Sequence, residues 1–372
     1  MKSWIHLSKG QVPRQARVGV GELKEDLLGR QGFFGRAAEL YHLHGPTAWT
    51  RIEGKLRPWD IDGYQLKPGD QGDPQGESLK VFYNADVSMA ISRRRAAMPY
   101  YFRNADGDEI HFIHKGTGTF ETEFGPIPYE PGDYIVLPRG VTYRVVPEGQ
   151  DTFFMVIESV GEVEFPDYGA LGRYTPFDPT VIQVPDPQPL QSDGQKEWEV
   201  RIKREGEYTS VFYPFHPLDV VGWKGDLFPF KLNIRDYRPI MSDRMHLPPS
   251  AHCIFQSRGF VVCNLLPRPA EGEPDVERLP QYHRNIDYDE VILVHGGRMF
   301  GVEIPLGTLL LNPQGIHHGL PEEARRWYKA HWRKDEYYDW QLINVDCERP
   351  LKVTPEAQAA ARGANHLYGS RT

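Results

Sequence analysis

An internal repeat constrains the fold of this 372-residue chain more than any other feature. Residues 101–116 read YFRNADGDEIHFIHKG and residues 282–297 read YHRNIDYDEVILVHGG, so Tyr, Arg, Asn, two Asp, Glu, His and Gly recur in the same order without a gap. Each copy is followed by a second matching block, GDYIVLPRGVTY at 132–143 and GTLLLNPQGIHH at 307–318. A repeat of this kind predicts two structurally similar halves.

The differences between the copies predict where the chemistry lies. His283 and His318 in the second half stand where the first half has Phe102 and Tyr143, whereas Glu290 has a counterpart in Glu109. Two His and one carboxylate are the ligand set of mononuclear non-haem Fe(II) oxygenases, because they hold the metal on one face and leave the other face open. We therefore predict an Fe(II) site at His283, Glu290 and His318.

The spacing of these residues resembles the paired motifs of the cupin superfamily, with Asn285 at a position that is usually His. His283 and Glu290 are seven residues apart, so on one continuous strand they would point to opposite faces. The polar stretch 285–289 predicts a turn that brings both side chains together from adjacent strands. The runs EVILV from residue 290 and TLLL at 308–311 predict strands of a small barrel.

Composition places the chain among β-rich globular proteins. With 36 Gly, 32 Pro and few helical patterns, we expect a mainly all-β fold of two cupin-type barrels. Short helices are expected only at 321–331 and 355–362. The Pro-rich stretch 168–195 predicts a connector between a metal-free domain, residues 1–185, and a metal-binding domain, residues 186–372.

Charge and hydropathy argue against several partners. The formal net charge of −8 makes nucleic acid an unlikely ligand, and no apolar run is long enough to span a membrane. We expect a cytoplasmic protein, because the N-terminus lacks a continuous apolar targeting segment. The three cysteines are too few for a disulfide framework and are expected to be buried.

Several segments together resemble homogentisate 1,2-dioxygenase in a compact bacterial form. They are YHRN at 282–285 with Glu290, HHG at 317–319, FPFKLNIRDY at 228–237, HLPPS at 246–250 and LYHLHGPTAWTRIEG at 40–54. The resemblance implies an Fe(II)-dependent opening of a hydroquinone ring by O2, homogentisate giving maleylacetoacetate in tyrosine and phenylalanine catabolism. It also implies a homo-oligomer.

The same resemblance assigns roles to further residues. His246 matches the family's acid/base histidine, and an imidazole titrates in the range needed to take a phenol proton. The family's tyrosine that binds the substrate carboxylate has no counterpart, since the sequence there is Gly297-Arg298-Met299. Arg298 is therefore the candidate carboxylate anchor. Tyr282 and His317 are further candidates for substrate binding.

Alternatives remain open from the sequence. Gentisate or another substituted hydroquinone is an alternative substrate, and a metal-dependent isomerase or lyase that does not use O2 is an alternative activity. His317 competes with His318 as the third ligand. A second metal site at Glu109, His111 and His114 is disfavoured, because Phe102 and Tyr143 replace the two imidazoles. His114 and His295 match each other and are expected to be structural.

Overall fold

The structure is a computed structural model, and it describes residues 5–30, 35–167, 171–172, 174–189, 194–245, 247, 249–276, 278, 281–298 and 304–362. Within these residues the regular secondary structure is almost entirely β-strand, and the two α-helices, α1 (Glu322–Ala330) and α2 (Pro355–Ala359), are short. The mainly all-β prediction is confirmed, and both helices fall where the sequence indicated. No described helix has the length and apolar character needed to cross a bilayer.

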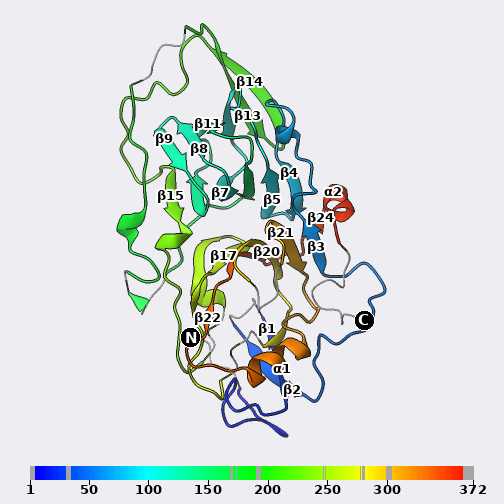
Figure 1. The fold of residues 1–372 in the computed structure, drawn as a ribbon. Coiled ribbons are helices and arrows are strands. Elements are labelled where there is room, and N and C mark those ends of the chain that lie inside the picture. Colours follow the sequence, from blue (N-terminus) through cyan, green and yellow to red (C-terminus); the bar gives the residue numbers. More distant parts are fainter. Residues whose placement is uncertain are drawn as a thin grey trace.

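One barrel is formed mainly by the first half of the chain (Figure 1). Its two sheets have the strand orders β15-β10-β7-β12-β5-β4-β24 and β14-β13-β6-β11-β8-β9. The bounds are β4 Leu79–Tyr83, β5 Val87–Ser92, β6 Tyr101–Asn104, β7 Asp108–Lys115, β8 Gly118–Thr122, β9 Gly125–Tyr129, β10 Asp133–Leu137, β11 Thr142–Pro147, β12 Phe153–Ser159, β13 Trp198–Arg204, β14 Glu207–Tyr213, β15 Phe230–Asn233 and β24 Lys352–Val353.

The other barrel carries the second copy of the repeat. Its sheets have the orders β16-β17-β23-β20-β21-β3 and β19-β1-β2, with a two-stranded ribbon β18-β22 beside them. The bounds are β1 Lys24–Gly29, β2 Ala37–His42, β3 Trp59–Asp62, β16 Cys253–Ser257, β17 Phe260–Leu265, β18 Arg268–Pro269, β19 Tyr282–Asn285, β20 Asp289–Gly296, β21 Thr308–Asn312, β22 Tyr337–Tyr338 and β23 Gln341–Cys347.

Alternation along the strands divides the apolar residues among separate cores. On β20, Val291 and Leu293 join a large core that also contains Ile110 and Phe112 of β7, so this core lies between the two barrels. Ile292, the intervening residue of β20, belongs instead to the interior of the second barrel. Each fully buried side chain of this size contributes about 1.5–3 kcal/mol. The two-faced burial explains why four consecutive residues of β20, 291–294, are apolar.

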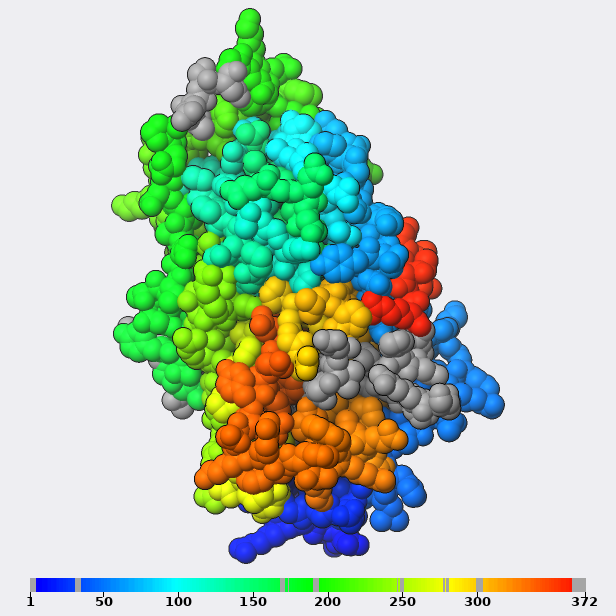
Figure 2. Space-filling view, in the orientation of Figure 1, coloured from blue at the N-terminus to red at the C-terminus, as the bar shows by residue number. Residues whose placement is uncertain are grey.

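Each barrel takes strands from distant parts of the sequence. β15 pairs with β10, and β24 pairs with β4, in a sheet of the first barrel. β3 pairs with β21, and β1 runs parallel to β19, in the second barrel. In Figure 2 the red C-terminal α2 accordingly lies against blue N-terminal segments. The domain boundary between residues 185 and 186 stays a prediction.

Candidate metal centre

The two copies of the repeat fold in the same way around their turns. In each copy an Asn ends the first strand of the motif, and its backbone carbonyl accepts a hydrogen bond from the N–H of a distant Gly. The carboxylate of the Asp that begins the next strand accepts a hydrogen bond from the backbone N–H of the residue before that Gly. These 2.8 Å bonds are Gly140 N to Asn104 O and Arg139 N to Asp108 Oδ1, and Gly315 N to Asn285 O and Gln314 N to Asp289 Oδ1. The shared Asn and Asp residues thus make the same structural contacts in both copies.

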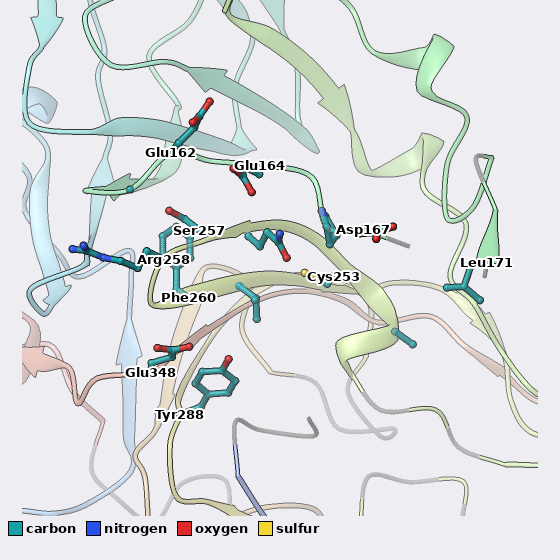
Figure 3. Close-up of a pocket in the computed structure, with 15 residues that line it drawn as sticks. Glu162, Glu164, Asp167, Leu171, Cys253, Ser257, Arg258, Phe260, Tyr288 and Glu348 are labelled. Carbon is teal, nitrogen blue, oxygen red and sulfur yellow. The ribbon is translucent and has the colours of Figure 1, made fainter. Parts of the chain in front are cut away.

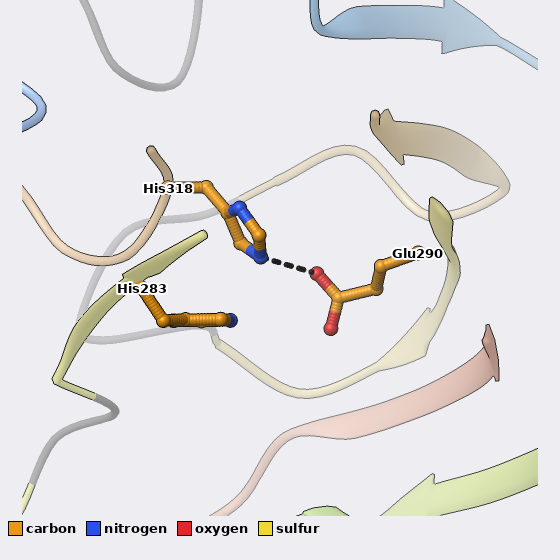
Figure 4. Close-up of side chains that lie close together, drawn as sticks. All are labelled: His283, Glu290 and His318. Atoms are coloured by element: carbon orange, nitrogen blue, oxygen red, sulfur yellow. Dashed lines mark ion pairs between the residues drawn. The ribbon is translucent and has the colours of Figure 1, made fainter. Parts of the chain in front are cut away.

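His283, Glu290 and His318 converge inside the second barrel (Figure 4). One potential ligand atom from each lies within 4.8 Å of the others, and all three side chains are buried. His283 is on β19 and Glu290 is on β20, consecutive strands that lie in different sheets rather than side by side. His318 is held opposite His283 by two backbone hydrogen bonds of 2.9 and 3.1 Å. The predicted turn at 285–289 therefore brings the ligands together across the barrel.

The two imidazoles are oriented by backbone carbonyls. His283 Nδ1 lies 2.9 Å from the carbonyl oxygen of Gln281, and His318 Nδ1 lies 3.2 Å from that of Ile316. A carbonyl can only accept, so both Nδ1 atoms carry the hydrogen and the lone pair of each ring lies on Nε2, the atom that would bind a metal. Burial, and then the neighbouring His318, lower the pKa of His283 to about 3. His283 is therefore neutral at physiological pH, as a metal ligand must be.

Glu290 supplies the negative charge of the site. Burial by itself would raise its pKa, but the contacts with His318, His283 and Asn312 outweigh burial and hold the pKa below its usual range. Asn312 Nδ2 donates to Glu290 Oε2 over 2.8 Å. His318 Nε2 lies 3.3 Å from the same oxygen but makes no hydrogen bond to any described residue. This donor set, one carboxylate and inward-facing imidazole nitrogens, fits a divalent metal ion such as Fe(II).

The first barrel closes the equivalent position with a phenol. Tyr143 donates its hydroxyl hydrogen to Glu109 Oε2 over 2.8 Å, and Phe102 packs edge-on against the Tyr143 ring. In the described part of the chain, the only group of three or more potential ligand side chains that lies close enough to hold a metal is the triad in the second barrel. The repeat thus keeps the fold in both halves but offers ligands in one.

The other predicted site residues fall in different surroundings. His317 Nε2 lies 3.2 Å from Asp26 and accepts a hydrogen bond from Arg284, so it faces away from the triad. Tyr282 is buried on β19 beneath the Arg325 guanidinium, which lies 4.2 Å from its ring centre. Arg298 is exposed and its backbone N–H donates to Asp339. Catalytic candidate His246 lies outside the described residues.

Distance along β20 separates Arg298 from the triad. Glu290 is near the start of β20, which ends at Gly296, and Arg298 follows that end. A six-residue advance along a strand covers about 20 Å, more than an arginine side chain can bridge. The structure therefore does not bring Arg298 together with the three ligands of its own chain.

Two polar contacts escaped the sequence reasoning. Asp26 of the N-terminal strand β1 is fully buried, and its Oδ2 lies 3.2 Å from both His42 and His317. On β23, Asn344 and Asp346 are buried polar residues of an otherwise apolar strand, and Asp346 is the register partner of Glu290. In the strand sequence QLINVDC these two polar residues alternate with apolar ones, and this pattern could have indicated a polar face. The position of Asp26 depends on pairing between residues more than 250 apart, which has no local signature.

A cleft of about 850 Å³ lies beside the second barrel (Figure 3). Its walls come mainly from residues 161–167, which leave the first barrel, and from the hairpin β16–β17. The cleft does not contain the triad, but Gln256 and Val261 in its wall are register partners, and Val261 is in turn the register partner of Asp346. One cross-strand row therefore leads from the cleft through Asp346 to Glu290.

Comparison with known proteins gives a partial match to one family model and two similar proteins. Residues 76–234 match the family model described as Homogentisate 1,2-dioxygenase N-terminal. A protein of Saccharolobus solfataricus that is provisionally named a dioxygenase is 29% identical over 349 residues, which cover 89% of each chain. The homogentisate 1,2-dioxygenase of Nitrobacter hamburgensis is 29% identical over 210 residues, which cover 54% of this chain and 46% of that protein.

Solved structures give weaker similarities. A cupin 2 conserved barrel domain protein from Leptotrichia buccalis aligns with a TM-score of 0.36 and 10% identity, over 81% of this chain and all of that one. The protein Ylba from E. coli aligns with a TM-score of 0.36 and 8% identity, over 80% of this chain and 93% of that one. Scores at this level say nothing about activity.

Proposed function

The chain is related to the homogentisate 1,2-dioxygenase family, and from this relation and the buried triad we propose that it is an Fe(II)-dependent ring-cleaving dioxygenase. The observation that carries the proposal is the convergence of His283, Glu290 and His318 in the one barrel that has both imidazoles. Three protein ligands leave open positions for an organic substrate and O2. The proposed partners are thus a small aromatic molecule and O2.

The side chains of the triad have separate tasks in this proposal. Fe(II) bound there would supply a Lewis acid and the electrons that O2 needs to react. The carbonyls of Gln281 and Ile316 hold the imidazoles in the tautomer that binds metal. Asn312 restrains one oxygen of Glu290, so the carboxylate cannot rotate freely. Together these contacts preorganise the ligands before any metal arrives.

Homogentisate is the proposed substrate, with cleavage to maleylacetoacetate, and gentisate is the alternative. His246 is proposed as the base that takes the phenol proton. Arg298 as carboxylate anchor stays a prediction, but its place beyond the far end of β20 gives it no support within one chain. Assembly into a homo-oligomer and a cytoplasmic location also stay proposals.

The experiment is oxygen uptake by protein reconstituted anaerobically with Fe(II), with homogentisate and gentisate tested in parallel. We expect homogentisate-dependent uptake together with the ultraviolet absorbance of an unsaturated diketo acid product. Uptake with gentisate alone would keep the iron site and change the substrate. Substrate conversion without oxygen uptake would contradict the dioxygenase proposal and favour a metal-dependent isomerase or lyase.

A further inference from the structure

Asn344 lies on the strand that faces the metal ligands. On β23, Asn344 and Asp346 point to the same side, because they are two residues apart. Asp346 is the register partner of Glu290, and Asn344 is the register partner of Ile292, whose side chain belongs to the interior core of the second barrel. Asn344 therefore faces the barrel interior, one side-chain repeat from the level of Glu290.

The amide of Asn344 has one unsatisfied atom. Its Nδ2 donates to Asp346 Oδ1 over 3.1 Å, which fixes the orientation of the amide. Its Oδ1 is buried and accepts no hydrogen bond from any described residue, while the whole residue is fully buried. A buried amide oxygen without a hydrogen-bond partner lowers the stability of the fold. Such an atom calls for an explanation, and a bound ligand or an ordered water would provide one.

The metal-free barrel has no amide at the matching position. Glu158 pairs with Glu109 in the first copy as Asp346 pairs with Glu290 in the second. Two residues earlier on the same strands, Val156 therefore corresponds to Asn344. Val156 is packed in the interior core of the first barrel. The barrel fold therefore does not require a polar side chain at this position. The polar side chain occurs only in the copy that carries the triad.

We propose that Asn344 determines specificity by accepting a hydrogen bond from the substrate hydroxyl that lies across the ring from the metal-bound oxygen. The inference deepens the proposed function, on which it rests. Two residues along a strand span about 6.6 Å. That span is of the same order as the separation of two oxygen atoms on opposite carbons of a benzene ring. A hydroquinone with one oxygen near Glu290 would therefore bring the other near the level of Asn344.

The cleft wall lies two strands away from this position. Cys253 lines the cleft, and it is the register partner of Cys263, which is in turn the register partner of Asn344. Two strand spacings, about 10 Å, thus separate the cleft wall from Asn344. Glu290 and Asp346 keep 6% and 7% of their surfaces exposed, so the interior at their level is not completely sealed.

The test compares two ligands that differ by one hydroxyl. 2,5-Dihydroxyphenylacetate and 2-hydroxyphenylacetate both keep the carboxylate and the hydroxyl beside it, but only the first has the distal hydroxyl. Their affinities for the Fe(II)-loaded protein would be measured by calorimetry without oxygen, for wild type, Asn344→Val and Asn344→Thr. Val reproduces the residue of the metal-free copy, and Thr has nearly the same shape but retains an oxygen that can accept a hydrogen bond.

We expect wild type to bind the dihydroxy compound on the order of tenfold or more tightly, Asn344→Val to bind both equally, and Asn344→Thr to recover part of the difference. Equal binding of both compounds by wild type, or an unchanged preference in Asn344→Val, would overturn the inference and assign the amide oxygen to an ordered water. If Asn344→Val does not fold, the inference is still tested by the preference of wild type for the dihydroxy compound and by the smaller preference expected of Asn344→Thr. A clear preference without oxygen uptake on any hydroquinone would reject the proposed function and leave the recognition by Asn344 intact.

Discussion

At the scale of single residues, two substitutions separate a candidate metal centre from a closed core. Phe102 and Tyr143 occupy the positions of His283 and His318, while the carboxylate is common to both copies. In the first copy the Tyr143 hydroxyl satisfies Glu109. In the second copy the carboxylate faces an imidazole nitrogen that makes no hydrogen bond to any described residue. The same framework thus gives two chemically different sites.

Asn312 is predicted to tune metal affinity by restraining Glu290. Asn312→Ala removes the 2.8 Å hydrogen bond to the carboxylate, so the ligand must be ordered when the metal binds. We expect Fe(II) or Zn(II) affinity to fall about 10- to 100-fold in a chelator competition titration. Tyr143→Phe is the matched control, because it removes the corresponding donor to Glu109 in the metal-free copy. Equal affinities of Asn312→Ala and wild type would show that the amide plays no part.

The sequence singled out the three residues that the structure brings together, because they stand in a fixed pattern close to turns. It also favoured His318 over His317, and the structure places His317 against Asp26 instead. The sequence analysis did not single out Asn344, despite its alternation with apolar residues on β23, and Asp26 has no local signal. Their proximity to the ligands arises from pairing of β23 with β20 and of β1 with β19, and such long-range register is not encoded in local spacing.

At the scale of elements, the strands and turns around the motif were predictable, but their partners were not. The β-branched and apolar runs gave β20 and β21, and the Gly and Pro residues gave the turns. Four short strands, β1, β3, β15 and β24, join barrels through pairings between distant residues. Nothing in the sequence of such a short strand specifies which sheet it joins.

The equivalence of the two barrels can be tested by building a site in the first. Phe102→His combined with Tyr143→His would place two imidazoles beside Glu109, in the geometry of the second copy. We expect the double variant to bind two metal ions per chain where wild type binds one, measured as Zn(II) stoichiometry by equilibrium dialysis. Phe102→His alone serves as the control and should leave the stoichiometry at one. A double variant that folds and still binds one ion would show that the barrels differ beyond these two residues.

At the scale of the whole molecule, a pair of histidines joins the barrels. His114 of β7 and His295 of β20 occupy matching places in the repeat, and their Nδ1 atoms lie 2.9 Å apart. Burial, and then the neighbouring His295, lower the pKa of His114 to about 3, and burial lowers that of His295 to about 4. Both rings are therefore neutral in the folded protein at physiological pH.

This pair predicts a pH-dependent stability. Below about pH 6.5 the two histidines are protonated in the unfolded chain but stay neutral in the folded protein, because their folded-state pKa values are about 3 and about 4. The free energy of unfolding should therefore fall as the pH drops from about 6.5 to about 4. His295→Gln should flatten this dependence in urea titrations at several pH values, and its difference from wild type should be largest at the acidic end. His44→Gln, which alters an exposed histidine, is the control. Parallel pH profiles of His295→Gln and wild type would contradict this role.

The most direct test of the account is the iron content of three proteins reconstituted anaerobically with Fe(II) and freed of unbound metal. The proteins are wild type, His318→Ala and His317→Ala. The two variants alter neighbouring histidines, but only His318 belongs to the triad, whereas His317 lies against Asp26. We predict one iron per chain in wild type and in His317→Ala, and almost none in His318→Ala. Iron retained by a folded His318→Ala protein, or lost from His317→Ala alone, would contradict a metal centre at His283, Glu290 and His318.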